Sequence, residues 1–294
     1  MTTSTSLDRA VDRLENAAAS GIACPPVRDL VGSDDIAAAY RVQTELVARR
    51  LQRGAARAGR KIGLTNPVVQ RQLGVGQPDF GVLLDDMAVP DDGLVPAGRL
   101  LQPRVEGEVA FRLAADLDGD IDQAAVRAAV ASTHAAIEIV DSRIAGWDIR
   151  IADTVADNAS SGLFVISERA VPLTAVEPVD VKMTLELNGQ LVSSGDGNAC
   201  LGDPLLALEW LARTAAAFGD PLRAGEIVLS GALGPMVDVH PGDRVRVAIS
   251  GLGPVSVAFG TGQAPGTGQA PGTGQAPGTG QAPGTGQAPG TGQR

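Results

Sequence analysis

Two stretches of the chain combine apolar and acidic positions in the manner of β-strands. In 102–113 a two-residue period places Glu106 and Glu108 on one face and the apolar side chains on the other. The second stretch, 135–141, is an apolar run with Glu138 embedded in it. If the two strands are neighbours, the three glutamates meet on one face and form an all-oxygen site.

Carboxylates that face inward together repel one another, so such a group needs a cation or a shared proton. The oxygens of Glu106, Glu108 and Glu138 suit Mg²⁺ or Mn²⁺, and they suit Zn²⁺ poorly because neither His nor Cys lies at ligand spacing. Glu-x-Glu is also the ordinary pattern of the solvent-exposed face of an antiparallel sheet. Spacing alone therefore leaves both interpretations open.

The remaining pattern predicts many short strands with a few helices between them. Helical spacing covers 7–18, the stretch from Ser33 as N-cap to about Leu51, 122–133 and 204–218. Such an arrangement predicts an α+β fold, a largely antiparallel β-roll or barrel with a small N-terminal helical section. The expected strands, with Asn188-Gly189 as a hairpin turn, are 60–65, 82–84, 94–95, 163–166, 181–187, 190–192, 226–230, 235–239 and 244–249.

Three connecting segments have distinct compositions. Residues 68–73 are expected to form one helical turn, and 74–81 is Gly-rich but lacks the third glycine of a dinucleotide-binding fingerprint. We therefore interpret 74–81 as a loop that carries Asp79. The stretch 153–162 is expected to be a polar loop.

The chain is expected to divide into three parts. Residues 1–59 form the helical section and residues 60–259 form the catalytic β-roll domain. From 260 to 294 the six residues Gly-Thr-Gly-Gln-Ala-Pro repeat without apolar positions that a solenoid could bury, which predicts a disordered tail.

Composition excludes some functions. The formal charge is 24 minus 34, or −10, and aromatic residues make up 3%, so the chain lacks the basic field and the stacking surfaces of nucleic-acid-binding proteins. No stretch has the length and apolarity of a membrane span, and the N-terminus has no export signal, so we expect a cytoplasmic protein without membrane contact. Cys24 and Cys200 are expected to be reduced and buried, and His134 and His240 to be structural.

Several stretches together are specific for one family. They are 59–65, 72–81, 103–108, 153–160 and 231–236. With them the chain resembles the 2-hydroxypenta-2,4-dienoate hydratases, also called 2-keto-4-pentenoate hydratases, of the fumarylacetoacetate hydrolase superfamily. The resemblance extends over about residues 5 to 259 and favours the metal interpretation of the glutamates.

The resemblance implies a hydro-lyase of meta-cleavage aromatic degradation. It implies that Glu106, Glu108 and Glu138 hold Mg²⁺ or Mn²⁺ and that water is added to 2-hydroxypenta-2,4-dienoate (2-oxopent-4-enoate) to give 4-hydroxy-2-oxopentanoate. The substrate, a small 2-oxo or 2-hydroxydienoic acid, can chelate such an ion, which then acts as a Lewis acid. It also implies a homo-oligomer, with 4-hydroxy-2-oxovalerate aldolase as a candidate channelling partner.

The resemblance also assigns roles to individual side chains. Lys61 lies in an apolar strand, where it could have a lowered pKa or bind the substrate carboxylate. Without the resemblance, Lys61 is an ordinary edge-strand lysine and Asp79 a turn former. Asp157 and Asn158 could fix their loop as Asx turns or support the metal from its outer shell. The expected catalytic residues are Lys61, Asp79 and Ser160, and the expected substrate-binding residues are Leu64, Thr65 and Ser161.

Two other functions stay open at this point. A 2-oxo-3-hexenedioate (4-oxalocrotonate) decarboxylase of the same superfamily would share the metal site and differ in accepting a second carboxylate. A non-catalytic scaffold subunit is the alternative from a different class. Loss of function on metal chelation would separate an enzyme from a scaffold.

Overall fold

The computed structural model describes residues 4–66, 70 and 77–262 of the 294-residue chain. These residues belong to one compact unit, Met1–Gln263. The repeat beyond residue 262 and most of the predicted turn and loop at 68–76 lie outside the described residues. The division at residues 59 and 259 stays a prediction. None of the helices in the described part of the chain combines the length and apolarity needed to span a bilayer.

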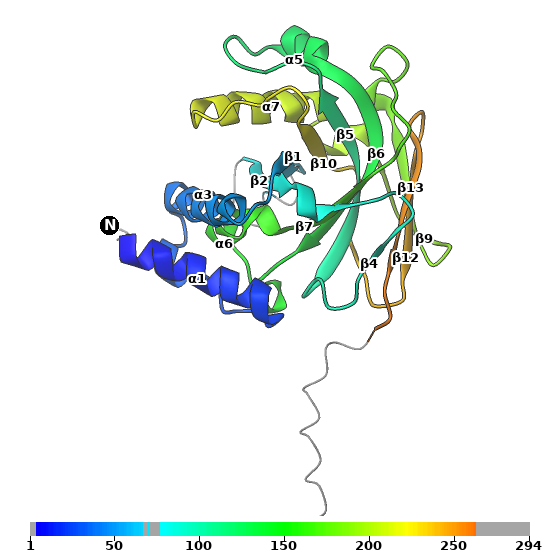
Figure 1. The fold of residues 1–294 in the computed structure, drawn as a ribbon. Helices are drawn as coiled ribbons and strands as arrows, with labels where there is room; N and C mark the ends of the chain where they lie inside the picture. The colour runs from blue at the N-terminus through cyan, green and yellow to red at the C-terminus, as the bar shows by residue number, and fades with distance from the viewer. Residues whose placement is uncertain (1–3, 67–69, 71–76, 263–294) are drawn as a thin grey trace, which may run out of the picture. The chain divides into compact units, whose positions relative to one another are not determined.

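The N-terminal section is helical, as predicted, and packs through small apolar side chains. Helix α1 buries a stripe spaced by three and four residues: Ala10, Val11, Leu14 and Ala17. Helix α1 packs on α3, which also contacts the short α6, as their arrangement in Figure 1 shows. The three helices share a small core separate from that of the sheets. The helices are α1 (Ser4–Ser20), α2 (Arg28–Val31), α3 (Ile36–Gln52), α5 (Gln123–Ala129), α6 (Ile151–Ala156) and α7 (Pro204–Ala217).

A large curled sheet forms the centre of the unit (Figure 1). It is 8-stranded, in the order β2-β1-β10-β5-β6-β7-β3, with β11 paired to β5. Most pairs are antiparallel, but β1 pairs with β10 and β3 with β7 in parallel. Its strands are β1 (Arg57–Gly63), β2 (Asp79–Leu84), β3 (Ala88–Val89), β5 (Pro103–Leu113), β6 (Val130–Asp141), β7 (Ser161–Ile166), β10 (Ile227–Ala232) and β11 (Val237–Asp238).

A second sheet of five strands covers one face of the first and closes the core, in the order β4-β13-β12-β8-β9. Asn188 and Gly189 both have positive φ, 54° and 80°, and make the predicted tight turn between β8 and β9. The strands are β4 (Gly93–Val95), β8 (Lys182–Leu187), β9 (Gln190–Asp196), β12 (Arg244–Ile249) and β13 (Gly253–Phe259). The predicted α+β roll is confirmed.

Some predicted boundaries are wrong. Helix α3 is capped by Asp35, whose carboxylate accepts a hydrogen bond from Ala38 N at 2.9 Å, and not by Ser33. The helix predicted at 122–133 ends at Ala129, because the β-branched residues from Val130 pair with β5. His134 therefore lies within a strand.

Three further segments differ from their predictions. Asp79 begins strand β2 and is not a loop residue. The predicted polar loop at 153–162 is a buried helix, α6, a turn at Asn158–Ser160 and the start of β7. Its polar side chains are buried because they bond to the backbone and to one another. Strand β13 was missed, although its apolar residues alternate.

Candidate metal centre

Three glutamates converge on one face of the large sheet, as the sequence predicts. Glu106 on β5 and Glu138 on β6 are direct register partners, and Glu108 follows two residues along the same face. One carboxylate oxygen from each residue lies within 4.8 Å of those of the other two. Glu108 and Glu138 are fully buried, and Glu106 is partly buried. The arrangement can therefore hold one metal ion.

The polar atoms of this cluster fit a divalent cation. Glu108 Oε1 and Glu138 Oε2 have no hydrogen-bond partner among the described residues. Burial and the neighbouring charge of Glu138 raise the pKa of Glu106 to about 7 and the pKa of Glu108 well above its ordinary value. Buried, unpaired carboxylate oxygens are unfavourable unless a cation or proton compensates them, and an all-oxygen set suits a hard ion.

Lys61 supplies one positive charge to the cluster. Its Nζ lies 2.9 Å from Glu138 Oε1 and forms an ion pair with it. Burial disfavours the ammonium, but the charges of Glu138 and its acidic neighbours outweigh burial and raise the pKa of Lys61. The structure thus favours a charged Lys61 over the lowered pKa considered from the sequence. One ammonium among three carboxylates leaves a negative excess.

Asp79 lies beside Lys61. It faces Gly63 across the β1–β2 pair, and a Cβ on Gly63 would lie 2.2 Å from Asp79 Oδ1 and 3.6 Å from Lys61 Nζ. Asp79 Oδ1 has no hydrogen-bond partner among the described residues. Burial raises the pKa of Asp79 to about 6, against the opposing charge of Lys61 and a hydrogen bond with the Thr154 side chain. This carboxyl group can therefore exchange a proton near neutral pH.

The segment 158–160, which we call the Ser160 turn, lies beside edge strand β2 and leads directly into strand β7. The Asn158 side chain accepts a hydrogen bond from Val82 N at 2.8 Å and donates one to Val82 O at 2.9 Å. It thus pairs with β2 as another strand would. A Cβ on Gly81 would lie 2.5 Å from Asn158 O, so a glycine is needed there for this close approach.

The Ser160 turn has an unusual backbone. Asn158, Ala159 and Ser160 all have φ of 52°, the left-handed region. That region costs about 1 to 2 kcal/mol for each residue other than glycine, so surrounding contacts must hold the turn. Ser160 Oγ lies 3.3 Å from Thr154 Oγ1, and the Ser161 hydroxyl donates to Asn158 O at 2.7 Å.

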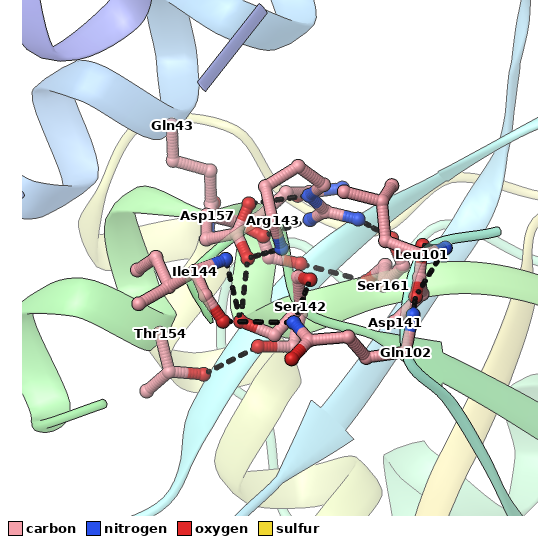
Figure 2. Close-up of polar contacts among 12 residues, drawn as sticks. Gln43, Leu101, Gln102, Asp141, Ser142, Arg143, Ile144, Thr154, Asp157 and Ser161 are labelled. Carbon is pink, nitrogen blue, oxygen red and sulfur yellow. Dashed lines mark hydrogen bonds and ion pairs between the residues drawn. The ribbon is translucent and has the colours of Figure 1, made fainter. Parts of the chain in front are cut away.

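Arg143 and Asp157 form a buried ion pair at the base of the turn (Figure 2). Arg143 Nε lies 2.5 Å from Asp157 Oδ1, and the Arg143 backbone N donates to Asp157 Oδ2 at 3.0 Å. Its other guanidinium nitrogens donate to Asp157 O at 2.5 Å and to Ser161 O at 2.7 Å. The sequence analysis missed Arg143 and Thr154. Thr154 is three residues from Asp157 and Arg143 is 14 residues from it, and neither a lone charge nor a lone hydroxyl in the sequence indicates these contacts.

The three predicted substrate-binding residues, Leu64, Thr65 and Ser161, lie in different surroundings. Thr65 is buried against Gly231, whose backbone N donates to Glu108 Oε2 at 2.7 Å. Leu64 packs against the N-terminal helical core. The Ser161 hydroxyl is used within the turn, as described above. The substrate contacts predicted for Leu64, Thr65 and Ser161 stay predictions.

The two histidines lie in different surroundings, and the structural role predicted for both stays a prediction. The ring of His134 contacts Ser132 Oγ at 2.9 Å and Ser167 O at 3.0 Å, whereas the side chain of His240 is 77% exposed. Both cysteines are free and buried, as predicted.

Comparison with known proteins identifies the family. Residues 38–259 match the fumarylacetoacetate (FAA) hydrolase C-terminal family. The chain belongs to this family. Within it, the chain is 51% identical over 252 residues to the TodF product hydratase of Pseudomonas putida F1, covering 85% of this chain and 94% of that protein.

A second relative in the FAA hydrolase family is 2-keto-4-pentenoate hydratase 1 of Dechloromonas aromatica strain RCB. It is 49% identical over 256 residues, which cover 86% of this chain and 97% of the relative. These relatives confirm the predicted resemblance to the 2-keto-4-pentenoate hydratases and the predicted hydro-lyase class.

Among solved structures, the chain is similar to 4-oxalocrotonate decarboxylase from Pseudomonas putida G7, in complex with magnesium and adipate. The TM-score is 0.85 at 33% sequence identity, and the match covers 88% of this chain and 99% of the decarboxylase. That structure contains magnesium, and the glutamate cluster of this chain offers carboxylate oxygens that suit such an ion.

Proposed function

We propose that this chain is a metal-dependent hydratase that adds water to 2-hydroxypenta-2,4-dienoate and releases 4-hydroxy-2-oxopentanoate in meta-cleavage aromatic degradation. The observation that carries the proposal is the position of Lys61 and Asp79 beside the glutamate cluster. Hydration of this substrate needs both a site for a 2-oxo acid and a group that moves protons. The hydratase names of the relatives support the same reaction.

The glutamate cluster would hold Mg²⁺ or Mn²⁺ through Glu106, Glu108 and Glu138. When bound, such an ion supplies Lewis-acid polarisation of the oxygens of a 2-oxo acid. The protein keeps these carboxylates in place with the β5–β6 register and with the hydrogen bond from Gly231 N to Glu108. Lys61 balances part of their negative charge.

The chain's own residues would handle the protons. Ketonisation of the dienol moves the 2-hydroxyl proton to C5, and water then adds its hydroxyl at C4 and a proton at C3. Asp79, with a pKa of about 6, can accept and return a proton near neutral pH. Lys61, whose pKa is raised by its acidic neighbours, can bind the substrate carboxylate or donate a proton. Ser160 can orient water.

One experiment separates hydratase from decarboxylase. The protein is incubated with Mg²⁺ and either 2-hydroxypenta-2,4-dienoate or its 5-carboxy analogue, and dienoate absorbance, CO₂ and products are followed. The proposal predicts 4-hydroxy-2-oxopentanoate from the first substrate and no CO₂ from the second. CO₂ from the second without turnover of the first would replace the hydratase by a 4-oxalocrotonate decarboxylase, the activity of the structural neighbour.

The scaffold alternative is tested by chelation. A scaffold would keep its function when the metal is removed, whereas the enzyme would lose turnover and regain it with Mg²⁺ or Mn²⁺. Homo-oligomer formation, an aldolase as channelling partner and a cytoplasmic location stay predictions of this proposal.

A further inference from the structure

The Ser160 turn is held in place by residues that lie outside the glutamate cluster. We propose that Arg143 and Asp157 are positioning residues for the hydration reaction. They fix the Ser160 turn so that the Ser160 hydroxyl is held in the chain of contacts that leads through Thr154 to Asp79. This inference rests on the proposed function, because it assigns Ser160 a place in that reaction.

The turn would not keep its shape by itself. It contains three successive residues with φ of 52°, and none of them is glycine. Side chains in this region are strained, and a strained backbone persists at a site only when its surroundings over-determine it. The contacts around the Ser160 turn must therefore stabilise its strained backbone.

Those contacts hold the turn at both ends. At its start, the Arg143 guanidinium binds both the side chain and the carbonyl oxygen of Asp157. At its end, the same guanidinium donates to Ser161 O at 2.7 Å. One planar, charged group thus spans the whole turn, and its fork geometry fixes the distance between the two ends (Figure 2).

The middle of the turn is fixed to strand β2. Asn158 makes two hydrogen bonds with Val82, on the strand that begins with Asp79. The Ser160 backbone N donates to Asp157 O at 3.0 Å. A displacement of Asp157 would therefore reach Ser160 directly.

The Ser160 side chain connects this clamp to the reacting region. Its hydroxyl lies 3.3 Å from the Thr154 hydroxyl. The Thr154 side chain is in turn close enough to Asp79 to act on the pKa of that carboxyl group. Arg143 and Asp157 are 13% and 1% exposed and form no ion pair with Glu106, Glu108 or Glu138 within the described part of the chain. They act on the site through Ser160, which makes them positioning residues.

A double-mutant cycle between Asp157→Asn and Ser160→Ala tests this inference. Asp157→Asn keeps the shape of the side chain but removes the charge that holds Arg143. We expect kcat for 2-hydroxypenta-2,4-dienoate to fall by roughly 10- to 100-fold with little change in Mg²⁺ affinity. In the Ser160→Ala background, Asp157→Asn should lower kcat by less than about 2-fold, because its effect passes through Ser160.

Two further variants sharpen the cycle. Arg143→Lys keeps the positive charge but loses the fork, and it replaces Asp157→Asn if that variant does not fold. Glu226→Gln is the matched control, because Glu226 is also buried but its charge is paired with Arg60 of strand β1 and not with a residue of the turn. Any effect of Glu226→Gln on kcat should be the same with and without Ser160.

A binding measurement separates this inference from the proposed function. Calorimetric titration with Mg²⁺ and 2-oxopentanoate, a saturated 2-oxo acid that cannot be hydrated, is carried out on the same four proteins of the cycle. We expect Asp157→Asn and Ser160→Ala to weaken binding by similar factors and the double variant to bind no more weakly than either. This coupling supports the inference even if the dienoate is not the substrate.

Three results would overturn it. They are additive losses in the cycle, a parallel loss of Mg²⁺ affinity in Asp157→Asn, and failure of the wild-type protein to bind 2-oxopentanoate. If the wild-type protein binds this acid but does not hydrate the dienoate, and the effects of the two substitutions on binding are coupled, then the proposed function fails and the positioning role stands.

Discussion

Glu106 and Glu138 are register partners on adjacent antiparallel strands of the large sheet. Residues paired in this way place their side chains on the same face, about 4.5 to 5.5 Å apart at Cβ. Like charges at that distance destabilise a sheet, and here both are buried or partly buried. A sheet keeps such a pair only where something compensates it, and Lys61 together with a divalent cation would do so.

Neutralising one glutamate should remove turnover without unfolding the protein. Glu106→Gln and Glu108→Gln keep the side-chain volume but remove a charged ligand oxygen. Loss of a side chain that only supports a metal ligand lowers activity by up to about 100-fold. We expect the loss of a ligand itself to lower kcat by more than that. Loss of dienoate absorbance reports the rate, and circular dichroism reports the fold. Glu186→Gln, on strand β8 of the other sheet, is the matched control and should be fully active.

Removing Lys61 should affect chemistry more than binding. For Lys61→Ala we expect kcat to fall by roughly 100-fold or more, within the range of lost acid–base catalysis. Lys182, whose side chain is 69% exposed, provides the control Lys182→Ala with unchanged kinetics. A change confined to KM would instead assign Lys61 to binding the substrate carboxylate.

The stability of the metal-free protein should depend on pH. Burial raises the pKa of Glu106 to about 7 and those of Asp79 and Asp157 to about 6, from ordinary values of 4.5 and 3.8. Between those values the folded state binds more protons than the unfolded state, so the free energy of unfolding falls as pH rises through about 4 to 7. Urea denaturation at several pH values, after chelation, measures this slope.

Divalent metal should reverse that loss. Mg²⁺ competes with protons for the glutamates, so its affinity and its stabilising effect should both increase with pH. At 100 times its dissociation constant it would add about 2.7 kcal/mol. A rise in the stability of the metal-free protein with pH over this range would contradict the raised pKa values of these carboxyl groups. Stability that Mg²⁺ does not change at pH 8 would contradict the metal site.

A methyl group at Gly81 should disturb the Ser160 turn. In Gly81→Ala the new Cβ would meet Asn158 O at 2.5 Å, and a backbone atom cannot move aside cheaply. We expect a loss of about 1 to 3 kcal/mol in the free energy of unfolding and a lower kcat. Gly262→Ala, where the nearest atom would be Ala97 Cβ at 3.4 Å, should change neither quantity. Equal stability of the two variants would show that the turn relaxes freely.

The sequence predicts the strands of the metal centre well, because their pattern is local. Glu106 and Glu108 alternate with buried apolar residues, and this period reports the strand and its inner face. The pairing of Glu138 opposite Glu106 is a contact between distant segments, which periodicity does not report. It was expected only if the two strands were neighbours, and the structure supplies that register.

The Ser160 turn could not be predicted in the same way. A polar stretch such as 153–162 has the composition of a surface loop, yet these residues are buried because Asp157 and Asn158 find partners far along the chain or across a strand edge. The role of Gly81 likewise depends on the backbone atom that lies opposite it. Such contacts follow from tertiary structure, so sequence pattern identifies the residues but not their arrangement.

The most direct test of the metal centre is a calorimetric titration of the chelator-treated protein with Mn²⁺. The account predicts one ion per chain in the wild-type protein and in Glu186→Gln, and loss of that site in Glu106→Gln, Glu108→Gln and Glu138→Gln alike. Wild-type affinity in any one of the three glutamate variants would contradict a shared three-carboxylate site.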